Sequence, residues 1–89
     1  MRKMKRRKPK DKATLVKHAQ KRFYERFNVD MSEDDIYTMS NLIREGRCEF
    51  IEKQSNRISL FYVNYNDKKY EVVYDKSRKS IVTVLPEDE

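Results

Sequence analysis

The sequence predicts an α+β fold in which two N-terminal helices pack on one face of a four-stranded antiparallel meander, in the order α-α-β-β-β-β. Two observations support this prediction. Apolar residues recur with helical spacing in the first half of the chain, and β-branched and aromatic residues cluster in short runs after the single glycine, Gly46. The chain has 89 residues and no internal repeat, which fits one small domain with a modest core.

The first helix is expected to begin near Asp11 or Thr14, either of which can cap it, and to run to about Phe27. Asn28 can adopt the left-handed conformation that ends a helix. At about 100° per residue, one arc collects the apolar side chains that should face the core. These are Leu15, Val16, Ala19, Phe23 and Phe27.

His18, Arg22 and Arg26 follow one another at intervals of one helical turn along the border of this apolar arc. Histidine is the side chain that ordinarily titrates nearest neutrality, and arginine can hold phosphate oxygens bidentately. The three residues could therefore form a catalytic edge. They could equally be a solvated edge in which His18 is structural and Arg22 pairs with Glu25.

A second helix is expected within "MSEDDIYTMSNLIREG", residues 31–46. Ser32 is a suitable N-cap, Met31 can pack on Ile36, and the acidic residues after Ser32 suit the positive end of the helix dipole. The inward stripe consists of Ile36, Met39, Leu42 and Ile43. Gly46 is placed to end the helix.

Four segments after Gly46 are typical of consecutive antiparallel strands: "RCEFIEK" (47–53), "RISLFYVNY" (57–65), "KYEVVYD" (69–75) and "SIVTVL" (80–85). Polar turns separate them at residues 54–56, 66–67 and 76–78. The middle two strands carry apolar side chains on both faces. One face should pack on the helices, and the other is available for a site. Pro86 stops the last strand.

The net charge of +6 is concentrated at the N-terminus. Residues 1–12 hold eight basic residues and one acidic residue, whereas residues 13–89 hold thirteen basic and fourteen acidic residues. The basic residues of this arm are Arg2, Lys3, Lys5, Arg6, Arg7, Lys8, Lys10 and Lys12. Such an arm binds polyanions by counterion release, or it is a flexible solubilising extension, and composition favours neither. The predicted organisation is this basic arm (1–12), one α+β domain (13–86) and a short acidic tail (87–89).

Several functional classes are excluded by what the sequence lacks. No apolar run approaches the roughly 20 residues that span a bilayer. The basic N-terminus is not followed by the apolar segment of a signal peptide, so we expect a cytoplasmic protein with no membrane contact. One cysteine, Cys48, and one histidine are too few for a zinc site within this chain. A single glycine excludes a glycine-rich phosphate loop. We therefore expect no metal and no cofactor.

A family resemblance emerges from three segments: His18, Ala19, Arg22 and Arg26 on the first helix, the "IREG" that ends the second, and "YEVVYDKSRKSIVTVL" (70–85). Together they resemble the small RelE-like proteins and, more broadly, the superfamily that joins barnase, EndoU, the colicin tRNases and the RelE toxins. The resemblance covers residues 14–85. It implies a RelE-like domain that binds RNA on the sheet face and helix edge and cleaves it by a metal-independent mechanism.

The resemblance implies roles for individual residues. His18 and Thr83 match catalytic positions, and Arg22, Arg26 and Arg57 match phosphate-binding positions. Metal-free RNA cleavage needs a proton carrier and cations at the phosphate, because the 2′-hydroxyl of the RNA is the nucleophile. Threonine also favours strands for purely structural reasons. The acidic C-terminal residues differ from the pattern of the RelE toxins that cut mRNA on the ribosome, which favours the colicin-like branch or an uncharacterised branch of the superfamily.

Tyrosines on the two central strands offer a further RNA-binding surface. Tyr62 and Tyr74, with Tyr65 and Tyr70 nearby in the sequence, could form a platform on which bases stack, at about 1–3 kcal/mol per base. They could also be aromatic residues at the edge of the core.

Two functional hypotheses follow. The first is an RNA-directed protein, a metal-independent endoribonuclease or toxin, whose basic arm recruits RNA or a ribonucleoprotein. The alternative is a non-catalytic module on the same fold that binds nucleic acid, a ribosome or a polymerase and regulates it. Both hypotheses allow a protein partner, such as an antitoxin or host machinery.

Overall fold

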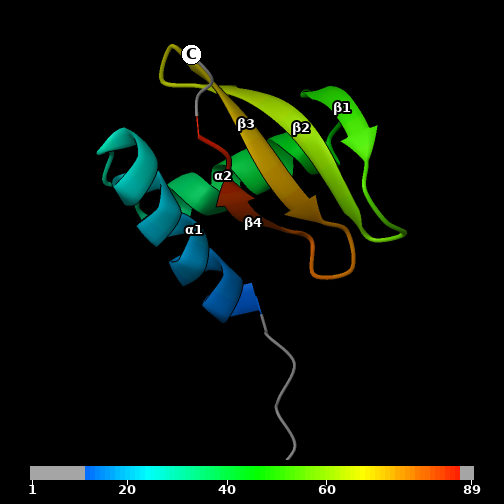
Figure 1. The fold of residues 1–89 in the computed structure, drawn as a ribbon, viewed down its shortest axis with the longest axis horizontal. Helices are drawn as coiled ribbons and strands as arrows, with labels where there is room; N and C mark the ends of the chain where they lie inside the picture. The colour runs from blue at the N-terminus through cyan, green and yellow to red at the C-terminus, as the bar shows by residue number, and fades with distance from the viewer. Residues whose placement is uncertain (1–11, 87–89) are drawn as a thin grey trace, which may run out of the picture.

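The computed structural model describes residues 12–86. Two helices, α1 (Lys12–Phe27) and α2 (Glu33–Arg44), precede four strands, β1 (Glu49–Lys53), β2 (Ile58–Tyr65), β3 (Lys68–Asp75) and β4 (Ser80–Val84). The strands form one antiparallel sheet in the order β1-β2-β3-β4 (Figure 1). The predicted α+β class and the order α-α-β-β-β-β are therefore confirmed.

Helix α1 ends as the sequence predicts. Asn28 has a φ of 56°, in the left-handed region, and its N–H donates a 2.9 Å hydrogen bond to the carbonyl of Tyr24. The helix begins at Lys12, so Thr14 lies in its first turn. Thr14 is therefore not the N-cap, which was one of the two alternatives that the sequence offered. Asp11, the rest of the basic arm apart from Lys12, and the acidic tail lie outside the described residues.

Helix α2 has a capping device at each end. The N–H of Asp35 donates to the Ser32 hydroxyl and the N–H of Ser32 donates to the Asp35 carboxylate, which completes a capping box. At the other end, Gly46 has a φ of 77°, and the N–H of Arg47 donates to the carbonyl of Leu42. Glycine adopts this conformation without steric cost, which explains why the helix ends here.

The register of the sheet follows from a two-residue turn between β2 and β3. Asn66 and Asp67 have φ values of 52° and 64°, the combination that matches the twist of a tight hairpin. This turn pairs Tyr65 with Lys68 and, at the far end of the hairpin, Ile58 with Asp75. The register shifts once between β1 and β2 and once between β3 and β4, where Val73 and Tyr74 are paired with Thr83 and Ile81.

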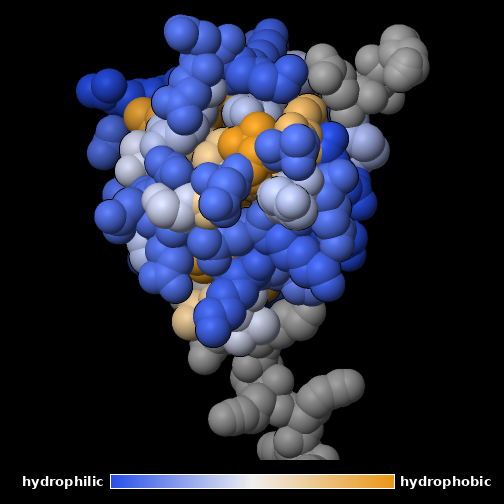
Figure 2. Space-filling model, turned by 90° about the vertical axis from the view of Figure 1, so that its left-hand side faces the viewer, coloured by the Kyte–Doolittle hydropathy of each residue, from blue (hydrophilic) through white to orange (hydrophobic). Residues whose placement is uncertain are grey.

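The core lies between the helices and one face of the sheet. Helix α1 lies beside β4, and α2 crosses behind the sheet (Figure 1). The buried residues that form the core are Val16, Ala19, Phe23, Met31, Ile36, Met39, Ile43, Val63, Tyr70, Val72, Tyr74, Ile81 and Val84. The face on the α1 side is mostly hydrophilic, with small hydrophobic areas (Figure 2). Within residues 12–86, none of the helices is long and apolar enough to cross a bilayer.

Candidate functional site

A pocket of about 420 Å³ lies between the N-terminal half of α1 and the end of the sheet where β2 and β4 begin and β3 ends. Its volume falls within the range of small-ligand pockets. The residues that line it are Leu15, His18, Arg57, Ile58, Asp75, Arg78 and Val82. Three of these carry apolar side chains, and the other four are ionisable, so the pocket combines an apolar wall with polar groups.

His18 reaches this pocket because of its position on α1. It lies one turn after Leu15, which is buried, and one residue before Ala19, which belongs to the core. Its side chain is half-buried and makes no hydrogen bond or ion pair with the part of the chain that the structure describes. The imidazole therefore lines the pocket without a polar partner among the described residues.

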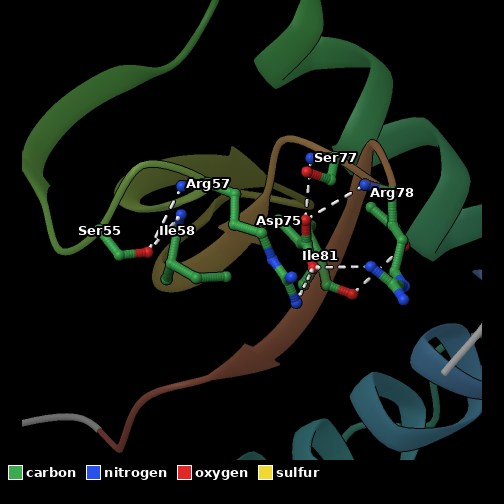
Figure 3. A network of polar contacts seen from close by, with 8 residues as sticks. Ser55, Arg57, Ile58, Asp75, Ser77, Arg78 and Ile81 are labelled. Atoms are coloured by element: carbon green, nitrogen blue, oxygen red, sulfur yellow. Dashed lines mark hydrogen bonds and ion pairs between the residues drawn. The ribbon is translucent and has the colours of Figure 1, made fainter. Parts of the chain in front are cut away.

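Asp75 organises the turn that follows β3. Its side chain is only 4% exposed, and its Oδ1 accepts hydrogen bonds from the backbone N–H groups of Ser77, at 2.9 Å, and Arg78, at 3.1 Å (Figure 3). An aspartate that accepts the N–H two and three residues ahead is a common turn motif. This motif sets the path of residues 76–79 and so brings Arg78 to the pocket.

Two arginines converge on the second oxygen of the same carboxylate. Asp75 Oδ2 lies 3.5 Å from Arg57 Nη2 and 3.9 Å from Arg78 Nη1 (Figure 3). Both distances are longer than the 2.7–2.9 Å typical of charge-assisted hydrogen bonds, so the two contacts are loose ion pairs. The Arg57 side chain is 55% exposed and that of Arg78 is 23% exposed, so solvent reaches both guanidinium groups.

The backbone around Arg57 is fixed by the loop between β1 and β2. The Ser55 hydroxyl accepts hydrogen bonds from the N–H groups of Arg57 and Ile58, at 3.4 and 3.1 Å. The carbonyl of Arg57 accepts a 2.7 Å hydrogen bond from the N–H of Lys76, in the turn after β3. The two loops that carry the arginines are therefore joined through a main-chain hydrogen bond.

The charges of the pocket favour an anionic ligand. Two guanidinium groups face one carboxylate, which leaves one positive charge before His18 is counted. Protonation of His18 would add a second positive charge. Arginine presents planar donors that match the oxygens of a phosphate, so the arrangement is chemically suited to a phosphate group.

The structure unites two of the residues expected from the sequence. His18 and Arg57, which are far apart in the chain, line the same pocket. Arg22 is paired with Glu25 at 3.1 Å, as the structural interpretation anticipated, and Arg26 is exposed, with no hydrogen bond or ion pair to residues that the structure describes. Neither lines the pocket, because Arg22 lies about one turn and Arg26 about two turns beyond His18 along α1.

Thr83 is not part of the pocket. It pairs with Val73 and is adjacent to Val84, a core residue, so its side chain projects toward the sheet face opposite the core. Its hydroxyl donates only a long, 3.5 Å hydrogen bond to the carbonyl of Val84. The expectation that His18 and Thr83 share one site is therefore not met by this arrangement.

The tyrosines do not form one platform. Tyr74 is 4% exposed and belongs to the core, so the expectation that it stacks on RNA bases is wrong. Burial also raises the pKa of its hydroxyl above the ordinary value of 10.0. Tyr62 pairs with Glu71, next to the core residue Val72, and therefore lies on the opposite, open face. There the Lys69 ammonium lies 4.5 Å from the centre of the Tyr62 ring.

Asp75 and Arg78 are pocket residues that the sequence interpretation missed. A signal for them was present in "YDKSRKS", because an aspartate directly before a polar turn commonly accepts the N–H groups of that turn. Such a turn motif predicts that Arg78 lies close to Asp75. The approach of α1 to both residues could not be inferred locally, since it depends on tertiary packing.

Side chains that could bind a metal ion are scattered over residues 12–86 rather than grouped. Among residues 12–86, no three His, Cys, Asp or Glu side chains lie close enough together to hold a metal ion. Cys48 is a free thiol, and partial burial raises its pKa above the ordinary value of 9.0, which disfavours the reactive thiolate.

No protein family, no curated protein and no solved structure was found to match this chain. The resemblance to RelE-like proteins therefore stays a prediction from the sequence, and the residues of the pocket carry the functional interpretation.

Proposed function

We propose that the protein is directed at RNA, that its pocket receives a phosphodiester group, and that it cleaves RNA by a metal-independent reaction in which His18 carries the proton. One observation carries this proposal. A histidine from α1 and two arginines from separate loops line a single pocket next to an apolar wall. The arginines supply charge for the phosphate, and the apolar side chains provide a surface for a ribose or base.

The proposed reaction needs no nucleophile from the protein. His18 accepts the proton of the ribose 2′-hydroxyl as the bond from O2′ to phosphorus forms. The bond from phosphorus to O5′ then breaks, and the imidazolium returns a proton to the leaving O5′. Arg57 and Arg78 stabilise the extra negative charge on the phosphoryl oxygens during this exchange. The products are a 2′,3′-cyclic phosphate and a 5′-hydroxyl end.

The basic arm has a separate part in this proposal. Its eight lysines and arginines attract RNA by counterion release wherever the backbone passes, whereas the pocket acts on one phosphodiester. Removal of residues 1–11 should therefore weaken binding of long RNA and reduce its salt dependence, while cleavage of a saturating short RNA should persist.

A second candidate is a non-catalytic module that binds nucleic acid, a ribosome or a polymerase. One observation favours it: the only other proton-accepting group in the pocket, Asp75, is engaged by two N–H groups and two arginines. Both oxygens of this carboxylate therefore already have partners within the protein. If one imidazole is insufficient for catalysis, the pocket would serve binding alone.

Incubation of purified protein with total RNA in the presence of EDTA separates the two candidates. The wild type, His18→Gln and Lys17→Gln should be compared, since Lys17 is the exposed neighbour of His18 and controls for changes on α1. Cleavage by the wild type and Lys17→Gln but not by His18→Gln, with 2′,3′-cyclic phosphate at the new ends, would support the nuclease. Equal cleavage by all three would remove the role given to His18. Intact RNA, with binding retained, would favour the binding module.

A further inference from the structure

The buried carboxylate of Asp75 occupies the position at which an anionic ligand would meet the two arginines of the pocket. Its Oδ2 is shared by Arg57 and Arg78, so two guanidinium groups already converge on one negatively charged oxygen (Figure 3). This arrangement is the one that a phosphate oxygen would require. The carboxylate and a phosphate therefore compete for the same two cations.

The two oxygens of Asp75 have different tasks. Oδ1 accepts the N–H groups of Ser77 and Arg78 at 2.9 and 3.1 Å, which are ordinary hydrogen-bond lengths, and so holds the turn. Oδ2 faces the arginines at 3.5 and 3.9 Å, too far for strong charge-assisted bonds. Oδ1 is thus hydrogen-bonded to the turn, whereas the contacts of Oδ2 with the arginines are long, so a ligand that replaces Oδ2 as their partner leaves the bonds that hold the turn intact.

We infer that Asp75 is an internal counterion of the pocket: it pairs with both Arg57 and Arg78 when no ligand is bound and offsets one of their two charges, and a phosphate must displace the two guanidinium groups from it. This inference rests on the proposed function in that it concerns the same pocket and a phosphate-bearing ligand. It adds that the affinity of the pocket for phosphate is set below the value that two unpaired arginines would give. Asp75 acts through the arginines and is not itself a catalytic residue.

Asp75→Asn tests this inference because it separates the two tasks. The amide oxygen of asparagine can still accept the N–H groups of Ser77 and Arg78, so the turn is retained, whereas the negative charge that faces the arginines is lost. The matched control is Asp67→Asn, which removes one negative charge from the exposed turn at the opposite end of β3. Asparagine tolerates the φ of 64° found at that position.

Affinity should be measured for two probes, inorganic phosphate and a fluorescent RNA hexamer, by NMR titration and fluorescence anisotropy at several salt concentrations. We expect Asp75→Asn to bind both probes about tenfold more tightly at low salt, since a negative charge next to the bound anion has been removed. The gain should shrink at high salt and disappear in the double variant Asp75→Asn with Arg57→Ala. Asp67→Asn should match the wild type.

The inference would be overturned if Asp75→Asn did not raise the affinity for phosphate. If Asp75→Asn binds phosphate as weakly as the wild type or more weakly, while the amide signals of Ser77 and Arg78 show an intact turn, Asp75 merely positions the arginines. An equal gain in Asp67→Asn would also contradict it, since the effect would then be one of net charge. Tighter binding of inorganic phosphate without any binding of the RNA hexamer would support the internal counterion and refute the RNA-directed function, so the two failures are distinguishable.

Discussion

The Tyr65 hydroxyl donates a 2.6 Å hydrogen bond to Oδ1 of Asp35 and thereby ties the end of β2 to the first turn of α2. Asp35 uses its other oxygen to accept the N–H of Ser32 in the capping box. One carboxylate therefore stabilises the start of a helix and fixes that helix to the sheet. The bond from Tyr65, followed by the backbone bond from Ser32, lowers the pKa of Asp35 below its ordinary value of 3.8.

Replacement of this tyrosine by phenylalanine should lower the free energy of unfolding by about 1 kcal/mol, because the charge-assisted bond to Asp35 is lost. The lowered pKa of Asp35 means that its contribution is present above pH 3.8 and is lost as the pH falls through the folded-state pKa. The same bond raises the pKa of Tyr65 above 10.0, so its contribution is lost as the pH rises through that raised value. Urea unfolding of Tyr65→Phe and wild type should differ most between these limits and converge in acid.

Tyr24→Phe is the control for this experiment, since Tyr24 is 60% exposed on α1. It should leave stability nearly unchanged at every pH. A difference between Tyr65→Phe and the wild type that stays constant down to pH 2 would show that Asp35 is not the acceptor that matters.

Ser40 connects α2 to β4 through its buried hydroxyl. The hydroxyl donates to the carbonyl of Ile36 at 2.9 Å and accepts the N–H of Ile81 at 3.1 Å. Ser40→Ala would leave the N–H of Ile81 buried without that partner, which should cost about 1–3 kcal/mol. Thermal and urea unfolding would measure this loss, with Ser77→Ala, at an exposed position, expected to stay within about 0.5 kcal/mol of the wild type. Equal stability of the two variants would contradict the proposed link.

Lys79 follows Arg78 in the pocket turn and has a φ of 57°, a conformation that side chains with a Cβ rarely adopt. Lys79→Gly should relieve this strain and raise the free energy of unfolding by about 0.5–1 kcal/mol. Lys76→Gly, in the same turn but without a positive φ, is the matched control and should bring no gain. The urea unfolding midpoints of both variants would measure this difference. Stabilisation by Lys76→Gly alone would refute the claim that the positive φ of Lys79 is strained.

Local features of the fold could be predicted from the sequence because each depends on a few neighbouring residues. Ser32 caps α2, while Asn28 and Gly46 adopt the left-handed conformation at the two helix ends, as expected. The turn at Asn66 and Asp67 also lies where the sequence predicts it. These residues act through their own backbone preferences, which tertiary packing reinforces rather than overrides.

Long-range features could be predicted only in part. The two central strands have apolar side chains on both faces, so composition alone did not reveal that Tyr74 faces the core and Tyr62 faces away from it. The register set by the two-residue turn would have supplied this information. The meeting of His18 with Asp75 and Arg78 depends on how α1 packs beside β4, which no local pattern encodes.

Arg57 is the pocket residue whose role is most directly testable, because its side chain is exposed and it lies in the loop directly before β2 rather than in the core. If it contacts a phosphate, Arg57→Ala should weaken binding of a short RNA about tenfold and reduce the salt dependence of binding by about one counterion. Arg47→Ala is the matched control, since Arg47 is 70% exposed and pairs with Glu45, outside the pocket. Anisotropy titrations over a range of salt concentrations would measure both quantities. Equal losses in the two variants would mean that the RNA senses overall charge and not the pocket, whereas a loss confined to Arg57→Ala would locate one phosphate beside Asp75.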